Sequence, residues 1–145
     1  MTIVRELTAA DLPVWRTLFR EYGEFYETVF DEGQLDHVSE LLLTADSGLM
    51  GLVAEVDGAV VGIAHYRSHP DAFGRGKDWF LDDLYVDPAA RGAGAASALI
   101  EHLRAMAASG DGSLRWITAA SNTTAQSVYD KVATRTTWIT YEVRL

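Results

Sequence analysis

The 145-residue chain has no cysteine, which excludes disulfide bonds, thiolate metal sites and a cysteine nucleophile. It has no apolar run near the roughly 20 residues that a membrane-spanning helix needs, so we expect no membrane partner. Residues 1–6 read as a strand with charges directly behind it, which is not the pattern of a signal peptide. We therefore expect a cytoplasmic protein.

Positive charge is also scarce. The 12 lysines and arginines are outnumbered by 21 aspartates and glutamates, and the formal net charge is −9. Proteins that bind the nucleic-acid backbone present a basic face, so we expect no nucleic-acid partner. The negative charge permits a cationic substrate, although acidity alone also keeps a protein soluble.

The remaining composition is that of one globular domain, which we expect to span residues 1–145. Apolar residues make up 48% of the chain and charged residues 23%. The order of predicted elements indicates an α/β fold whose mixed, mostly antiparallel sheet carries helices on both faces. Hydrophobic periodicity predicts strands at 2–7, 49–56, 59–66, 79–86, 114–119 and 136–145, helices at 12–26, 35–43, 97–109 and 122–132, and a break at 31–34.

The most informative stretch is 81–97, where an acidic strand runs into a loop that contains glycine and alanine alone before a helix begins. Such a loop leaves backbone N–H groups unshielded at the positive end of the helix dipole, where a phosphate or pyrophosphate fits. No lysine follows either glycine, as a Walker loop would need, and Ser97 stands where a dinucleotide fingerprint has its third glycine. The alternative is a small-residue helix start that packs against the sheet.

Two motifs carry a resemblance to a known family. The pattern Arg-x-x-Gly-x-Ala at 91–96 resembles the coenzyme A signature of the GNAT family of N-acetyltransferases, and Asn-x-x-Ala-x-x-x-Tyr at 122–129 resembles its second motif. The strand Leu-Asp-Asp-Leu-Tyr-Val at 81–86 is similar to that of the polyamine- and histone-acetylating branch. The matching segments cover residues 1–132 in the family's order. The resemblance implies the GNAT fold, in which the sheet is splayed between two parallel strands, here 79–86 and 114–119.

The resemblance also implies acetyl-CoA as the co-substrate, bound in that splay. Backbone groups of the strand would pair with the pantetheine amides, the loop N–H groups would take the pyrophosphate, and the second motif would border the pantetheine arm. His65 and His69 stand on a strand and a loop, so we expect no metal. The implied cofactor-binding residues are Leu84, Tyr85, Val86, Arg91, Gly92, Ala93, Gly94, Ala95, Ala96, Ser97, Asn122 and Ala125.

By the same resemblance, Tyr129 is the general acid that protonates the departing thiolate. Free tyrosine, with a pKa of about 10, is a weaker acid than a free thiol, with a pKa of about 8.5. We therefore expect Tyr129 to act through a hydrogen bond that strengthens as the sulfur gains charge. The alternative is a tyrosine that fills a gap in the core.

Asp82 stands where the branch has a glutamate, and it is the candidate for removing the amine proton through water. The alternative is an ion pair with Arg67, Arg75 or Lys77. Asp83, the next residue of the strand, is expected to point to the opposite face.

Tyr22, Glu24 and Tyr26 lie on the first predicted helix, where family members often shape the acceptor pocket. Aromatic and acidic side chains together suit an ammonium group. The alternative is an amphipathic helix with a solvated acidic edge.

We therefore predict an acetyl-CoA-dependent N-acetyltransferase that moves acetyl directly to a small cationic amine, such as a polyamine or an amino acid. One alternative is acetylation of a protein lysine or N-terminus, and another is an acyl-CoA-binding module without catalysis. Family members usually follow the second motif with Gly-Phe and a terminal hairpin, whereas this chain has a single predicted strand at 136–145. We hypothesise a homodimer in which a neighbouring chain supplies the missing edge strand.

Overall fold

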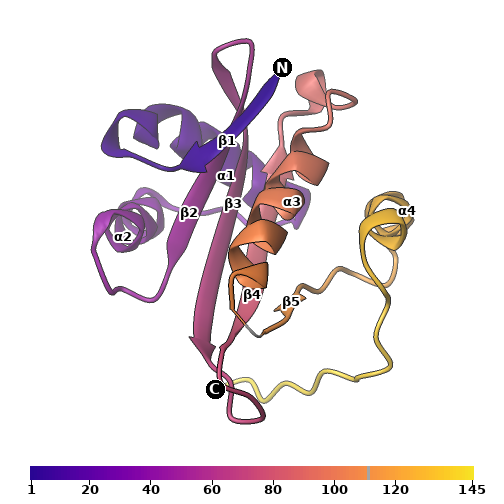
Figure 1. Ribbon diagram of the computed structural model, residues 1–145. Coiled ribbons are helices and arrows are strands. Elements are labelled where there is room, and N and C mark those ends of the chain that lie inside the picture. Colours follow the sequence, from indigo (N-terminus) through magenta and orange to yellow (C-terminus); the bar gives the residue numbers. More distant parts are fainter. Residues whose placement is uncertain (111) are drawn as a thin grey trace.

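The computed structural model describes residues 1–110 and 112–145, and its centre is a five-stranded sheet (Figure 1). The strands lie side by side in chain order, and each of the first three pairs antiparallel with the next. The last pair, β4 with β5, is parallel. The predicted mixed, mostly antiparallel sheet is confirmed. Its strands are β1 (Thr2–Glu6), β2 (Met50–Val56), β3 (Ala59–Pro70), β4 (Lys77–Val86) and β5 (Leu114–Arg115).

Helices cover both faces of this sheet, as predicted. Figure 1 shows α3 (Ala95–Ala108) in front of the strands, with α1 (Leu12–Phe25) and α2 (Glu32–Leu43) behind them. Successive strand residues point to opposite faces, so Leu52 packs with the α3 side and Val53 with the α1 and α2 side. Both side chains are completely buried. The sheet, including β4, therefore lies between two apolar layers.

A network of hydrogen bonds fixes the start of α1. The Thr8 backbone N–H donates to Asp11 Oδ2 at 2.8 Å, and the Asp11 N–H donates back to the Thr8 carbonyl at 3.0 Å. Arg5 of β1 grips both Asp11 oxygens at 2.8 Å and also reaches Glu55 of β2 at 2.7 Å. These contacts lower the pKa of Asp11 to about 2, with the Arg5 guanidinium as the main cause. The capping residues therefore also tie α1 to the sheet.

Three boundaries differ from the predictions by three residues or more. Helix α2 begins at Glu32 and not after a break at 31–34, because Asp31 caps it by accepting from the Gln34 N–H at 2.8 Å. Strand β3 continues to Pro70, since it pairs with β4 from Gly62 to Pro70. Strand β5 is shorter than the predicted 114–119 and ends at Arg115.

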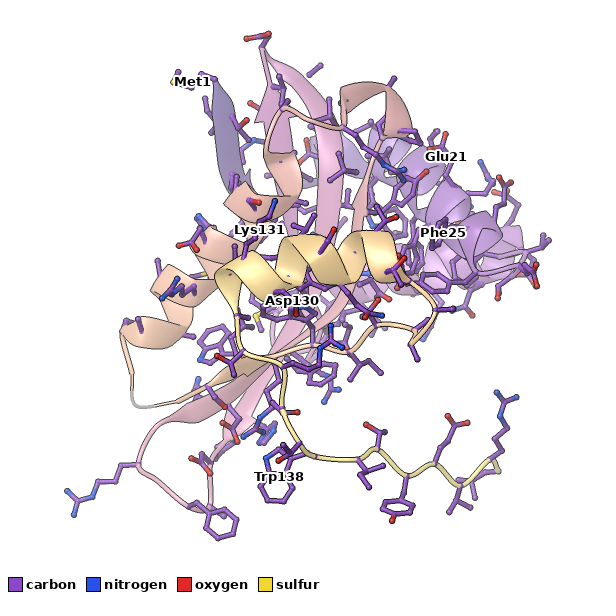
Figure 2. All side chains as sticks on the ribbon, turned by 90° about the vertical axis from the view of Figure 1, so that its right-hand side faces the viewer. Met1, Glu21, Phe25, Asp130, Lys131 and Trp138 are labelled. Atoms are coloured by element: carbon purple, nitrogen blue, oxygen red, sulfur yellow. The ribbon has the colours of Figure 1, made fainter. Side chains whose placement is uncertain are left out.

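The predicted strand 136–145 is wrong for the single chain. Residues 133–145 follow α4 (Thr123–Val132) without regular secondary structure. Figure 2 shows this segment leaving the end of α4 as an extended chain that passes through Trp138. A strand needs a neighbour to complete its backbone hydrogen bonds, and alternating sequence alone does not supply one.

Candidate functional site

The site is built where β4 and β5 part. These strands pair at Trp79 with Leu114 and at Phe80 with Arg115, and within the described residues they pair nowhere else. The edge of β4 that faces β5 is therefore left without a strand partner along 81–86. Residues Leu84, Tyr85 and Val86 lie on this stretch, so their backbone groups are available to an extended ligand arm.

The loop after β4 is open and shaped by glycine. Gly92 has φ +91° and Gly94 has φ +81°, a region that favours glycine, and a Cβ added at either would meet nothing within 4 Å. Gly94 is the N-cap of α3, so the backbone N–H groups of the first helical turn, Ala95 to Ser97, have no partner within the helix. Asp87 fixes the approach by accepting from the Ala89 N–H at 2.9 Å. The residues present thus fit a phosphate or pyrophosphate.

The start of α4 is fixed by two amide side chains. Asn122 caps the helix by accepting from the Ala125 N–H at 3.2 Å. Gln126 donates to the carbonyls of Ala119 and Ala120 at 3.0 Å each, so it ties the helix to the loop before it. The sequence analysis did not identify Gln126, because an amide in the first turns of a helix carries no distinctive signal.

Tyr129 faces the same region from α4. Its ring packs edge-to-face on Trp116, with the centroids 5.4 Å apart. Burial, with a smaller contribution from Tyr26, raises the pKa of Tyr129 above its ordinary value, so the hydroxyl keeps its proton at neutral pH. The Tyr129 side chain also lines a groove of about 1240 Å³ between the 114–118 segment, α4 and the C-terminal segment.

The two adjacent acids of β4 lie on the same face, contrary to the prediction. His65 of β3 pairs with Asp83 and Tyr66 pairs with Leu81, so Asp82 is an extra residue in a β-bulge. The bulge resets the alternation of side chains. Asp82 consequently reaches Arg67, whereas Asp83 reaches His65, two residues earlier on the same face of β3.

Asp82 and Asp83 have different partners. Arg67 Nε lies 3.1 and 3.0 Å from the two Asp82 oxygens, and its guanidinium stacks 4.6 Å from the centre of the Phe80 ring. Asp83 instead accepts from the Tyr22 hydroxyl at 2.8 Å and lies 3.0 Å from His65 Nδ1. Asp82 thus forms an ion pair with Arg67, which the sequence analysis gave as one alternative to a role as base.

The three predicted acceptor residues of α1 separate into two places. Tyr22 contacts Asp83, and the Tyr26 ring packs edge-to-face on Tyr22 at 5.0 Å. Glu24 lines a shallow depression of about 670 Å³ together with Glu21, Tyr85 and Arg91. The structure therefore brings Tyr22 and Tyr26 to the acidic strand and leaves Glu24 beside the cofactor loop.

The two histidines considered in the sequence analysis have separate partners. His65 is buried against Trp15 and Asp83, and His69 Nδ1 lies 2.9 Å from the Pro70 carbonyl. Across residues 1–110 and 112–145, no group of three or more potential metal ligands comes together. In the same part of the chain, no helix combines the length and apolar character needed to cross a bilayer.

Comparison with known proteins places this geometry in a family. The Acetyltransferase (GNAT) family model matches residues 15–133. The D-amino-acid N-acetyltransferase HPA3 of Saccharomyces cerevisiae is 29% identical over 143 residues, which cover 97% of this chain and 89% of the yeast protein.

Solved structures share the fold over the whole chain. The ribosomal-protein-alanine N-acetyltransferase from Brucella melitensis biovar Abortus 2308 superposes with a TM-score of 0.84 at 24% identity, covering 100% of both chains. The aminoglycoside N-acetyltransferase AAC(6')-Iy in complex with CoA gives 0.82 at 21% identity, covering 100% of this chain and 95% of the other. With the family model matching most of its length, this chain belongs to the acetyltransferase (GNAT) family and is an N-acetyltransferase.

Proposed function

We propose that this protein transfers acetyl from acetyl-CoA directly to the amine of a small cationic acceptor, such as a polyamine or an amino acid. The observation that carries the proposal is the open glycine loop at the start of α3, which follows directly on the unpaired edge of β4. The yeast relative, whose name gives a D-amino acid as its substrate, supports a small amine.

The residues of this splay would hold acetyl-CoA, which supplies an activated acetyl group as a thioester. Backbone groups of Leu84, Tyr85 and Val86 pair with the pantetheine arm as a neighbouring strand would. The N–H groups of 92–97 take the pyrophosphate at the positive end of α3, and Arg91 adds a cation beside it. Asn122 and Ala125 border the arm from α4. The alanines at 93, 95 and 96 leave the backbone accessible, as larger side chains would not.

Tyr129 is the proposed acid. Because its pKa is raised, it is a weaker proton donor than a free thiol, and full proton transfer to sulfur is unfavourable. The hydroxyl instead donates a hydrogen bond that gains strength as negative charge develops on the leaving group. Two points support direct transfer to the amine: the sequence has no cysteine to carry the acyl group, and its motifs suggest no other nucleophile.

Asp82 as the base stays a prediction, and its surroundings argue against it. Both Asp82 oxygens already accept from Arg67 Nε, and this ion pair competes with a role in taking a proton from the acceptor. A water molecule or the bulk buffer is then the simpler proton acceptor.

Thiol release from acetyl-CoA tests the function directly. We expect release with at least one member of an amine panel, and a Tyr129→Phe variant should lower kcat by roughly 10²-fold. Tyr66→Phe is the matched control, because it removes a hydroxyl from a buried tyrosine on the α3 side of the sheet. Release only with lysine peptides would support the protein-acetylating alternative. No release with any amine, with CoA still raising the melting temperature, would favour a non-catalytic CoA-binding module.

We also propose a homodimer formed through the C-terminal segment. Apolar and polar residues alternate along this segment. Its apolar side chains are largely exposed in the single chain: Trp138 is 84% exposed and Tyr141 is 89% exposed. The outer edge of β5 borders the open groove that this segment faces. Addition of 136–145 from one copy to the β5 edge of the other would complete the backbone hydrogen bonds of both. A stable monomer at micromolar concentration in sedimentation would contradict this arrangement. A cytoplasmic location stays a prediction.

A further inference from the structure

A chain of hydrogen bonds ends on Asp83, and the proposed acetyl transfer does not use its buried members. Trp15 Nε1–H donates to His65 Nε2 at 2.8 Å, and His65 Nδ1 lies 3.0 Å from Asp83 Oδ2. The second Asp83 oxygen accepts from the Tyr22 hydroxyl at 2.8 Å. Trp15 and His65 are 0% and 1% exposed. Three elements (α1, β3 and β4) therefore converge on one carboxylate.

The hydrogen bonds of this series all run in one direction, from Trp15 through His65 to Asp83. The indole N–H is a donor only, so His65 Nε2 must accept and carries no hydrogen. The ring hydrogen is then on Nδ1, from which it is donated to Asp83. A second proton on Nε2 would set two donors against each other in a buried place, which is costly. His65 is therefore neutral, and its role is to donate the Nδ1 hydrogen to Asp83.

These contacts keep Asp83 ionised. Burial alone would raise its pKa, but the contacts with His65 and Tyr22 lower the pKa of Asp83 below its ordinary value. Burial and the neighbouring carboxylate raise the pKa of Tyr22, which keeps this hydroxyl a donor. The other titratable groups on this side are Tyr26, Tyr129, Tyr85, whose hydroxyl donates to Glu21, and the ion pair of Asp82 with Arg67. The one cation among these groups, Arg67, is paired with Asp82.

Part of the carboxylate remains open. Each Asp83 oxygen uses one hydrogen bond, and the side chain is 28% exposed. A carboxylate oxygen accepts two bonds, so both oxygens can take a further donor from the open side. The rings of Tyr26 and Tyr85 pack edge-to-face with that of Tyr22, with centroids 5.0 and 6.2 Å away, so three aromatic rings gather beside this carboxylate. An anion among aromatic rings is a site for an ammonium group.

The acidity of Asp83 decides whether it binds the amine that reacts or another ammonium group of the acceptor. An alkylammonium group has a pKa of about 10, and a carboxyl group has one of about 4, so a carboxylate with a lowered pKa disfavours proton uptake from it by more than about a million-fold. An amine bound to Asp83 would stay protonated and could not attack the thioester. The amine that reacts must therefore be a different group of the acceptor.

We propose that Asp83 binds a second, non-reacting ammonium group of the acceptor, and that Trp15, His65 and Tyr22 are positioning residues that orient this carboxylate. The proposal rests on the proposed acetyl transfer and adds a rule of specificity to it. An acceptor with two amines is acetylated at one while the other is held on Asp83.

The test compares 1,4-diaminobutane with 1-aminobutane as acceptors. We expect the wild-type protein to have a kcat/KM roughly 10–100-fold higher for the diamine, the range expected for one charge-assisted hydrogen bond. In Asp83→Asn this ratio should fall to about one, through a rise in KM for the diamine. Asp36→Asn is the matched control, because it removes the same charge from the exposed surface of α2, and it should keep the ratio.

Two outcomes would overturn the proposal. One is a wild-type ratio near one, and the other is a fall in kcat for both amines in Asp83→Asn, which would make Asp83 a base. Both differ from failure of the proposed function, in which the wild-type protein releases no thiol with either amine.

The positioning role has its own measurement. In nitrogen NMR of the wild-type protein near neutral pH, His65 should carry its ring hydrogen on Nδ1, because Nε2 accepts from Trp15, with the exposed His37 as the reference signal. Trp15→Phe keeps an aromatic ring but removes the N–H, so the ring hydrogen is no longer held on Nδ1, and KM for the diamine should rise while KM for 1-aminobutane stays the same. A wild-type His65 that carries its hydrogen on Nε2 would overturn the positioning role without any variant.

Discussion

Replacement of Gly94 by glutamine should separate cofactor binding from folding. Gly94 has φ +81°, and a Cβ added there meets nothing within 4 Å, so the change brings backbone strain without a clash. A residue other than glycine in this left-handed conformation lowers the free energy of unfolding by roughly 1–2 kcal/mol. The new side chain begins in the open space that the loop presents, where we place the pyrophosphate.

The chain offers a close control at Gly58. This residue has φ +83° in the turn between β2 and β3, and a Cβ added there also meets nothing within 4 Å. Gly58→Gln therefore carries a similar backbone cost in a turn that lies outside the loop. Without ligand, both variants should lose a similar amount of stability.

Thermal unfolding with and without CoA gives the readout. A ligand at 100 times its Kd raises the free energy of unfolding by about 2.7 kcal/mol. For a chain of this length the corresponding rise in Tm is roughly 5–10 °C. The wild-type protein and Gly58→Gln should show this rise, and Gly94→Gln should lose most of it. A full rise in Gly94→Gln would mean that the pyrophosphate is bound elsewhere.

Three further changes test the scaffold. Asp11→Asn should lower the free energy of unfolding by about 2 kcal/mol at pH 7, since the Arg5 pair lowers the pKa of Asp11 from 3.8 to about 2. This contribution is complete above the unfolded pKa and is lost as the pH falls toward 2, so urea unfolding of the variant and wild type should converge at low pH. Asn122→Ala should cost about 1 kcal/mol in the same assay, because the Ala125 N–H loses its cap. Leu103→Ala should cost about 3 kcal/mol, since this side chain is completely buried between α3 and the sheet, and a loss below about 1 kcal/mol would contradict that packing.

Local signals in the sequence predicted local structure well. The Asp57-Gly58 turn has φ +51° and +83°, as a tight hairpin requires, and it joins strands close to the predicted bounds. The glycine loop and the start of α3 also follow from residues that are adjacent in the chain. In each case the residue types that determine the backbone stand next to one another.

The surroundings of the two acids could not be predicted in this way. The bulge at Asp82 depends on how β4 pairs with β3, and nothing within β4 itself signals it. Asp83 is bonded to His65 and Tyr22, which lie 18 and 61 positions away in the sequence. The shortness of β5 and the lack of structure in 133–145 have a similar cause, because a strand forms only where another strand is present to pair with it.

The bulge gives the site its distribution of charge. It turns both acids to one face, where Asp82 is neutralised by Arg67 and Asp83 receives hydrogen bonds from groups that carry no charge. Of the two, Asp83 is therefore the one whose negative charge stays uncompensated. At the far end of β4, the glycine loop and the start of α3 present backbone N–H groups and favour an anion. One strand thus separates a place for the phosphates of a cofactor from a place for a cation, and the reacting amine is to be expected between them, near Tyr129.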